Sequence, residues 1–506
     1  MGIPVMIVRP ARLLVLVGLW ILNSHDSISS ASDLLIEGVT VVSPERVGLG
    51  RDVSVYILDG RIAEISKHPS QQAQQAAKSV DGHGLFLAPG MIDGHTHLDE
   101  IPGMILDHEE AYPEIARQAR AQIPRSYLYY GFTTVVDLNA RPETIEKWNS
   151  REDRPRAYFC GAAPVFDGYP TVWLPQPARY RIVPYFLFDA SRAADFPSGF
   201  EPEDHTPRAV VDRMHQDGAT CVKTHFERGF GGRGDMPVPT VEVIRELVEA
   251  AHEKGMPVLL HANSEEAQAF GVETKVDVLA HGMWTWENKE TTDPTAGVTQ
   301  VLDSIVENKI GMQPTIQVLF GERDLFDPSF LSNPLLGDAV PPGLIEWYRT
   351  TEEGGWWRGR LENIPGVAKL LAGGRWEEID AEPITRAKNA LRYLAKRDGR
   401  LYFGSDTPSD PTYANPPGLN GRLEMNNWID AGVSLEQLFK AVTSENAKLF
   451  GLAEDLGTVE TGKTANLLLM RRNPLESVEA YDSIESVILE GRIIARSELS
   501  ARQQGN

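Results

Sequence analysis

Pro89-Gly90-Met91-Ile92-Asp93-Gly94-His95-Thr96-His97-Leu98-Asp99 is the stretch from which the fold can be predicted. Its apolar residues predict a buried strand that the chain enters through the turn at Pro89-Gly90. Because side chains alternate across a strand, His95 and His97 point to the same face. Two imidazoles side by side on a rigid element form half of a site for zinc or a similar divalent ion. An isolated His-x-His pattern is more often two polar residues at a strand end. A metal site is therefore indicated only if further ligands occur elsewhere in the chain.

The composition is that of an ordinary globular protein and limits the choice of partners. The chain has 506 residues, of which 42% are hydrophobic and 24% are charged, enough for one large domain and a smaller one. The net charge of -22 argues against a nucleic-acid partner, which would need a basic surface. We expect a small-molecule substrate as the partner, and a homo-oligomer is compatible with this composition.

Residues 1–32 have the features of a secretory signal. Arg9 and Arg12 supply positive charge, Leu13–Leu22 is an apolar run too short to span a membrane comfortably, and residues 29–32 are small enough for a cleavage site. The alternative is an uncleaved membrane anchor. We therefore expect a periplasmic or secreted protein without a stable membrane anchor after cleavage.

The chain contains two cysteines, Cys160 and Cys221. Two are too few for a disulfide scaffold, even in an oxidising compartment. Both fall in predicted strands, so we expect buried free thiols.

Strand-rich segments lie at both ends of the mature chain. Residues 33–88 contain short strands separated by tight turns, such as the hairpin turn at Asp59-Gly60. Residues 453–506 contain further apolar strands at 466–470 and 486–494. We predict one small β-sandwich built from these two segments.

Residues 89–452 alternate short apolar runs with amphipathic stretches, which is typical of parallel βαβ units. Eight strand–helix units predict an α/β fold, a (β/α)8 TIM-type barrel, whose chemistry lies at the carboxyl ends of its strands. An insertion at about 317–380, rich in Gly, Pro and Trp, is either a lid over that face or a packed subdomain. The eight predicted strands are Met91–Leu98, Phe132–Leu138, Arg156–Ala162, Ala219–His225, Pro257–Ala262, Val276–Gly282, Ile310–Thr315 and Leu401–Asp406.

Side chains with metal-binding chemistry recur where five of the eight predicted strands end. Five such strand ends, in this order, are hard to explain as accidents of a core. The residues are, along the chain, His95, His97, Lys223, His225, His261, His281 and Asp406.

These motifs resemble those of the amidohydrolase superfamily, over nearly all of the mature chain. Residues 89–97 look like its first-strand motif, Gly404-Ser405-Asp406 looks like its eighth-strand motif, and residues 457–467 look like its C-terminal return into the sandwich. Residues 131–137 are similar to the imidazolonepropionase-like and Xaa-Pro dipeptidase-like branch. The resemblance implies a metal-dependent hydrolase in which a barrel carries a small β-sandwich.

The resemblance also implies a binuclear metal centre, with zinc as the expected ion. Lys223 would bridge two ions after carboxylation, because an ammonium cannot bind a metal whereas a carbamate offers two oxygens. In mononuclear members one ion is held without the lysine, and His281 contacts the substrate. For Lys223 the alternatives are then substrate binding or an ion pair. The implied ligands are His95, His97 and Asp406 for a buried ion, His261 and His281 for a more exposed one, and Lys223 between them.

Two of these residues are implied to take part in catalysis. A metal-bound hydroxide would attack the substrate, and Asp406 would take its proton and deliver it to the leaving group. His281 is the second catalytic candidate. Arg228, in the glycine-rich loop after the fourth strand, and His225 are predicted to bind substrate, with Arg228 clamping a carboxylate. The alternatives are a surface arginine and a solvated loop histidine.

The function we predict is that of an exported metal-dependent amidohydrolase that cleaves a C–N amide bond of a small substrate, such as a dipeptide or an N-acyl amino acid. A mononuclear deaminase or a hydrolase of cyclic amides or lactones is the alternative, because the same hydroxide serves all of them. A non-catalytic barrel scaffold is the alternative from another class. Such a scaffold would be marked by missing ligands, whereas every ligand position is filled here.

Overall fold

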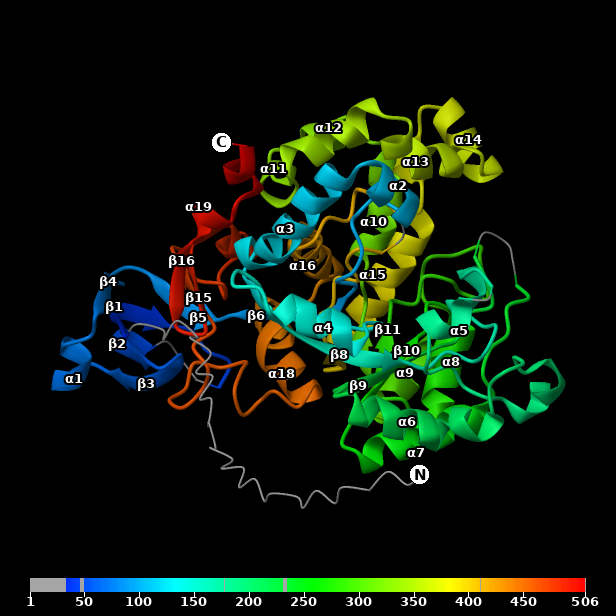
Figure 1. Cartoon of the computed structure of the whole chain (residues 1–506), viewed down its shortest axis with the longest axis horizontal. Coiled ribbons are helices and arrows are strands. Elements are labelled where there is room, and N and C mark those ends of the chain that lie inside the picture. The colour runs from blue at the N-terminus through cyan, green and yellow to red at the C-terminus, as the bar shows by residue number, and fades with distance from the viewer. Residues whose placement is uncertain (1–32, 46–49, 177, 231–233, 410, 506) are drawn as a thin grey trace, which may run out of the picture.

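The computed structural model describes residues 33–45, 50–176, 178–230, 234–409 and 411–505, so the predicted signal at 1–32 lies outside it. Two eight-stranded sheets organise these residues. One is formed by the middle of the chain and the other by its two ends, and the second lies to the left in Figure 1. Among the helices of these ranges, none has both the length and the apolar character needed to cross a membrane.

The middle of the chain forms a parallel sheet in which neighbours in sequence are neighbours in space. Each of the eight predicted strands overlaps one strand of this sheet. Backbone hydrogen bonds also link its first strand to the segment after its last, with Asp406 N donating to His95 O and His97 N donating to Thr407 O, both at 2.8 Å. The curled sheet is consistent with a TIM-type barrel. Its strands are β6 (Met91–Thr96), β7 (Phe132–Asp137), β8 (Arg156–Ala162), β9 (Cys221–His225), β10 (Val258–His261), β11 (Val278–Ala280), β12 (Gly311–Gln313) and β13 (Arg400–Leu401).

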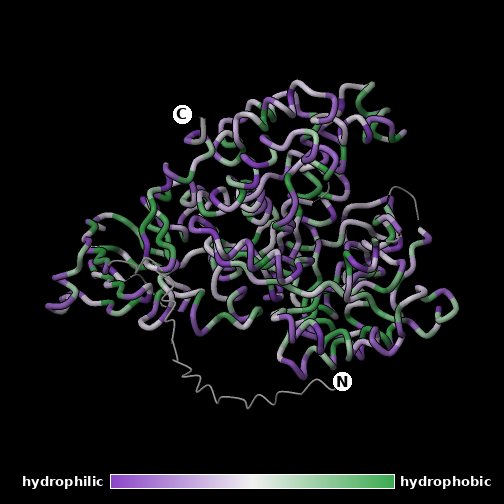
Figure 2. The backbone as a smooth tube through the Cα atoms, in the orientation of Figure 1, coloured by the Kyte–Doolittle hydropathy of each residue, from purple (hydrophilic) through white to green (hydrophobic). Residues whose placement is uncertain are grey.

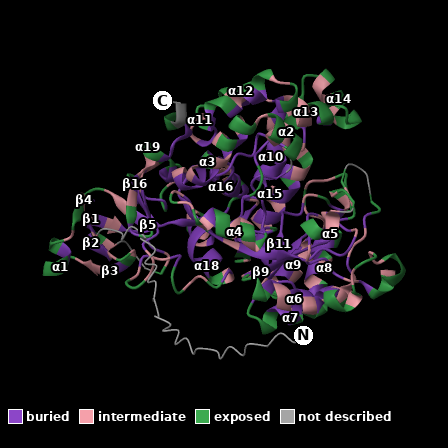
Figure 3. Ribbon diagram, viewed as in Figure 1, coloured by how far each residue is buried: buried purple, intermediate pink, exposed green. Residues whose placement is uncertain are grey.

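Amphipathic helices follow the strands. In the helix Val241–Glu253 (α7), Thr240 caps the first turn, and Ile244 and Leu247 are buried where the helix covers the sheet. Figure 3 shows the same division, with buried strands and helices exposed on their outer faces. The other helices beside the sheet are α3 (Pro113–Tyr129), α4 (Pro142–Asn149), α6 (Pro207–Gln216), α8 (Glu265–Thr274), α9 (Ala296–Glu307), α15 (Ala381–Ala395) and α16 (Leu419–Ala431).

The prediction of free thiols was wrong, because Cys160 and Cys221 form a disulfide. The parallel pairing of β8 with β9 makes the two residues register partners, and their Cα atoms lie 4.3 Å apart. Both are fully buried among apolar side chains that include Leu259 and Val278. Their spacing along the chain gives no sign of this adjacency.

The two ends of the chain share one mixed sheet, joined by the antiparallel pairing of β5 with β14. Side chains alternate across β14, so its two faces belong to two hydrophobic cores. Leu467 and Leu469 pack within the terminal sheet, whereas Leu468 and Met470 pack against the parallel sheet. Hydrophobic residues along these strands are visible in Figure 2. The β-sandwich stays a prediction. The strands are β1 (Leu34–Val41), β2 (Gly50–Leu58), β3 (Arg61–Ser66), β4 (Lys78–Asp81), β5 (Phe86–Pro89), β14 (Leu467–Met470), β15 (Ile484–Leu489) and β16 (Arg492–Ala495).

The predicted insertion at about 317–380 is helical and packs against the segment that follows β6. Trp347 is buried and its ring contacts those of His108 and Tyr112. The indole of Trp356 donates a hydrogen bond to Gly103 O at 3.2 Å. These contacts favour a packed subdomain over a free lid. The helices of the insertion are α10 (Gln317–Arg323), α11 (Leu336–Ala339), α12 (Pro342–Thr350), α13 (Trp356–Glu362) and α14 (Pro365–Ala372). Of these helices, α11 and α12 contact α3, and α10 contacts α15 and α16. His108 of α2 (Leu106–Ala111) meets the rings of Trp347 and Trp356.

Candidate metal centre

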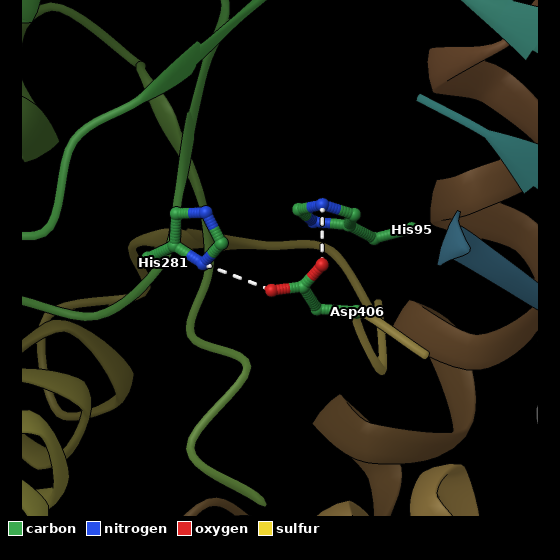
Figure 4. A group of neighbouring side chains, drawn as sticks. All are labelled: His95, His281 and Asp406. Carbon is green, nitrogen blue, oxygen red and sulfur yellow. Dashed lines mark ion pairs between the residues drawn. The ribbon is translucent and has the colours of Figure 1, made fainter. Parts of the chain in front are cut away.

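Three histidines converge on the carboxylate of Asp406 at the carboxyl ends of the parallel strands. His95 Nε2 and His97 Nε2 lie 3.1 and 2.9 Å from Asp406 Oδ1, and His281 Nδ1 lies 3.6 Å from Oδ2. Figure 4 shows the buried group of His95, His281 and Asp406, whose ligand atoms all lie within 4.8 Å of one another. Imidazole nitrogens and a carboxylate oxygen at this spacing are a donor set suited to zinc.

The other predicted ligands lie beside this group. Lys223 Nζ is 3.4 Å from His95 Nε2. The ring of His261 lies 4.4 Å from that of His281 and 5.8 Å from that of His225. The structure therefore brings all six predicted ligands and His225 into one largely buried cluster, while their individual roles stay predictions.

Burial determines the charge states in the cluster. It lowers the pKa of His95 to about 3 and that of Lys223 to about 7. Burial alone would raise the pKa of Asp406, but the nearby histidines, His95 foremost, hold that pKa well below its usual range. Burial would also lower the pKa of His97, but its hydrogen bond to Asp406 and the charge of that carboxylate outweigh burial and raise this pKa to about 9. Metal binding requires neutral imidazoles beside an ionised carboxylate, so an ion bound here would have to displace a proton from His97.

A divalent ion fits the residues that are present. Within the described ranges, His95 Nδ1 is buried without a hydrogen-bond partner. Two imidazole nitrogens, His95 Nε2 and His97 Nε2, also crowd the same oxygen of Asp406. A bound ion would remove this competition, because both nitrogens would then direct their lone pairs to the ion. The donor types and their convergence agree with a bound cation.

Asp93 was missed by the sequence analysis, although it holds the loop that carries Asp406. Its carboxylate is buried and accepts a hydrogen bond from Ser405 N at 2.9 Å and another from His95 N at 3.2 Å. A Cβ on Gly404 would lie 2.6 Å from His95 Cβ, so only glycine lets the two strand ends approach this closely. An acidic residue inside an apolar strand was the available signal.

Glu227, Asn263 and Thr315 were also missed. Glu227 Oε2 lies 3.2 Å from His261 Nε2 and accepts a hydrogen bond from Asn263 Nδ2 at 2.8 Å. Thr315 Oγ1 lies 2.8 Å from His281 Nδ1. Each of the two histidines thus has a polar partner, which fixes the orientation of its ring.

Arg228 lies at the surface, and its described contacts are away from the cluster. Its guanidinium pairs with Glu266 at 2.9 Å, with both side chains about half exposed, and lies over the ring of Phe226. Binding of a substrate carboxylate by Arg228 stays a prediction that requires this pair to open.

Comparison with known proteins identifies the family. Two sequence models, each described as amidohydrolase family, match residues 86–286 and 359–495. The first match contains five of the six predicted ligands and the second contains Asp406. The chain therefore belongs to the amidohydrolase superfamily, a class of hydrolases.

Individual relatives are more distant. Allantoinases of Escherichia coli strains O1:K1 and O81 are 33% identical to this chain over 117 residues, which is 23% of this chain. The match spans about a fifth of the length of these curated relatives, 22%.

Solved structures resemble the chain over most of its length. A Xaa-Pro dipeptidase with bound methionine has a TM-score of 0.61 at 19% identity and is covered completely by 92% of this chain. Ochratoxinase of A. niger has a TM-score of 0.62 at 17% identity, with 92% of this chain and 96% of that chain covered. Phenylurea hydrolase B has a TM-score of 0.64 at 20% identity, with 92% and 97% covered. At these identities the likeness shows the fold.

Proposed function

We propose that this protein is an exported, metal-dependent amidohydrolase that cleaves a C–N amide bond of a small substrate such as a dipeptide or an N-acyl amino acid. The observation that carries the proposal is the convergence of His95, His281 and Asp406 in one buried group. The proposal includes a closed (β/α)8 barrel at 89–452 and a β-sandwich formed by 33–88 and 453–506.

Two zinc ions would occupy the cluster. His95, His97 and Asp406 would hold one, and the imidazoles of the fifth and sixth strands would hold the other. When bound, such ions polarise a carbonyl and make a water molecule more acidic. One ion is the alternative arrangement.

Lys223 is placed to become a bridging ligand. Burial lowers the pKa of its ammonium to about 7, which favours the neutral amine that attacks carbon dioxide. The new bond joins the amine nitrogen to the carbon, one proton leaves, and the product is a carbamate with two oxygens. Its position 3.4 Å from His95 Nε2 supports this assignment.

Asp406 would handle the proton in the reaction. Its Oδ1 is approached by both His95 and His97, whereas Oδ2 has only the longer contact of 3.6 Å with His281. Oδ2 is therefore the atom that would take a proton from the attacking water and deliver it to the leaving amine. In the one-ion arrangement His281, 3.6 Å from this oxygen, would orient the substrate carbonyl.

The names of the structural relatives favour a linear amide as substrate. One is a Xaa-Pro dipeptidase, and another is phenylurea hydrolase B. We transfer from them the class of bond that is cleaved, and the particular substrate has to come from experiment.

The experiment that tests the proposal measures metal content and turnover together. Protein purified without chelator and supplied with bicarbonate should contain two ions per chain and hydrolyse members of a dipeptide or N-acyl amino acid collection. Lys223→Ala should lose metal occupancy. One ion in both proteins, with ammonia released from aminated heterocycles, would instead indicate the mononuclear deaminase. Absence of both metal and turnover would indicate the scaffold, in which Asp406→Asn leaves partner binding unchanged.

A further inference from the structure

Glu227 is a buried carboxylate beside His261 for which the proposed reaction has no role. Its side chain is 6% exposed. Oε2 lies 3.2 Å from His261 Nε2 and accepts a hydrogen bond from Asn263 Nδ2 at 2.8 Å, while Oε1 accepts one from Gly229 N at 2.7 Å. Both carboxylate oxygens are therefore held in fixed positions against the imidazole.

The charge of Glu227 requires compensation. In the part of the chain that the structure describes, it forms no ion pair with a lysine or arginine, and His261 is its one ionisable partner. A buried carboxylate is costly unless a positive charge lies near it. The His261 ring lies beside the cluster, with the centroid of the His281 ring 4.4 Å away. A cation bound there, to the same imidazole, would supply the missing positive charge.

The position of Glu227 also selects one form of the imidazole. A carboxylate can only accept hydrogen bonds, so Glu227 Oε2, at 3.2 Å, favours the form of His261 that carries its proton on Nε2. The amide Nδ2 of Asn263 also lies near this nitrogen, at the longer distance of 3.4 Å, and donates its shorter hydrogen bond to Glu227. The neutral ring then has its lone pair on Nδ1. Among the described residues, no hydrogen bond to Nδ1 is found, so this nitrogen is available.

We infer that Glu227 is a positioning residue, which holds His261 with its proton on Nε2 so that Nδ1 is offered to a divalent cation. The inference rests on the proposed function. A carboxylate behind a metal-bound histidine fixes the ring and makes its free nitrogen a better ligand. The nearest partner of His281 Nδ1 is instead the hydroxyl of Thr315 at 2.8 Å, which can either donate or accept, and the carboxylate near it, at 3.6 Å, belongs to the predicted ligand Asp406.

The test is the dissociation constant for zinc, measured by competition with a chelator on the full-length protein. Glu227→Gln keeps the volume of the side chain but removes its charge, and Glu227→Ala removes the partner entirely. Glu265→Gln is the matched control, because Glu227 and Glu265 are each 7% exposed as whole residues and Glu265 also accepts a backbone hydrogen bond, from Glu287 N at 2.9 Å. Thermal unfolding of each metal-free protein reports on folding separately.

We expect both Glu227 variants to bind zinc about 10- to 100-fold more weakly than the parent, with Glu265→Gln within about twofold of it. The absorption spectrum of bound Co²⁺ should change in the Glu227 variants alone. Equal affinities in the parent and the Glu227 variants would overturn the inference and leave the proposed function standing. A comparable loss in Glu265→Gln would also overturn it, by showing a general effect of removing a buried carboxylate. A parent that binds no zinc would overturn the metal-dependent function itself.

Discussion

Reduction of the disulfide between Cys160 and Cys221 should destabilise the parallel sheet. The bond joins β8 to β9 and closes a loop of 61 residues. Restricting the unfolded chain by a loop of this length is worth about 4 kcal/mol at 25 °C in the chain-entropy model. Both sulfur atoms are buried in an apolar environment, so reduced thiols would keep most of the same packing.

The assay compares unfolding by guanidinium chloride for the oxidised parent, the reduced parent and the double variant Cys160→Ala, Cys221→Ala. Reduction has to be carried out on unfolded protein, because the native bond is buried. The oxidised and reduced parents differ only in the cross-link, so the difference between their free energies of unfolding measures it. The double variant should be at or below the reduced parent, because it also loses two buried sulfurs.

Two outcomes would refute this reasoning. Coincident unfolding curves for the oxidised and reduced parents would show that the cross-link contributes nothing. Two titratable thiols in unfolded protein that was expressed with residues 1–32 included would show that the bond is not formed. The second result would restore the original expectation of free thiols.

Three further predictions concern single side chains. Asp406→Asn should lower turnover by about 10²–10⁴-fold at unchanged circular dichroism, and a loss below tenfold would contradict its role in proton transfer. Lys223→Ala should retain fewer ions than the parent by elemental analysis, and equal content would exclude the bridge. Burial raises the pKa of Glu424 to about 7, so the folded state binds this proton more tightly than the unfolded chain does. The free energy of unfolding should therefore fall by up to about 3 kcal/mol from pH 4.5 to 7, and Glu424→Gln should flatten that slope in denaturant titrations at several pH values.

The strands of the parallel sheet could be predicted because their signal is local. Apolar runs bounded by turns located all eight, and their alternation with amphipathic stretches indicated the parallel arrangement. The predicted strand Arg156–Ala162 coincides with β8, whereas Leu401–Asp406 was too long, because only Leu401 of it lies in β13 (Arg400–Leu401). The apolar run continues into Tyr402 and Phe403, which are buried although they follow the last residue of β13. A pattern of buried residues therefore does not mark the end of the strand.

Features that depend on register or on a loop could not be predicted. The partners Cys160 and Cys221 are adjacent only because β8 and β9 pair in one particular register. Glu227 meets His261 only because the chain turns back after β9, and nothing in the adjacent sequence specifies that turn. The packing of Trp347 on α2 likewise depends on how the insertion folds over a distant segment.

The alternation of side chains along a strand predicts the relative orientation of His95 and His97, but not that of His281 and Asp406. His95 lies in β6 and His97 directly follows its end, and both contact the same oxygen of Asp406, as alternation predicts. His281 and Asp406 lie beyond their strands with φ of 89° and 54°, in the left-handed region that costs a non-glycine residue about 1–3 kcal/mol. Backbone hydrogen bonds of 2.8 Å, from His281 N to Gln313 O and from Asp406 N to His95 O, hold them there. The strained backbone aims both side chains at one point, which is the arrangement that a preorganised metal site requires.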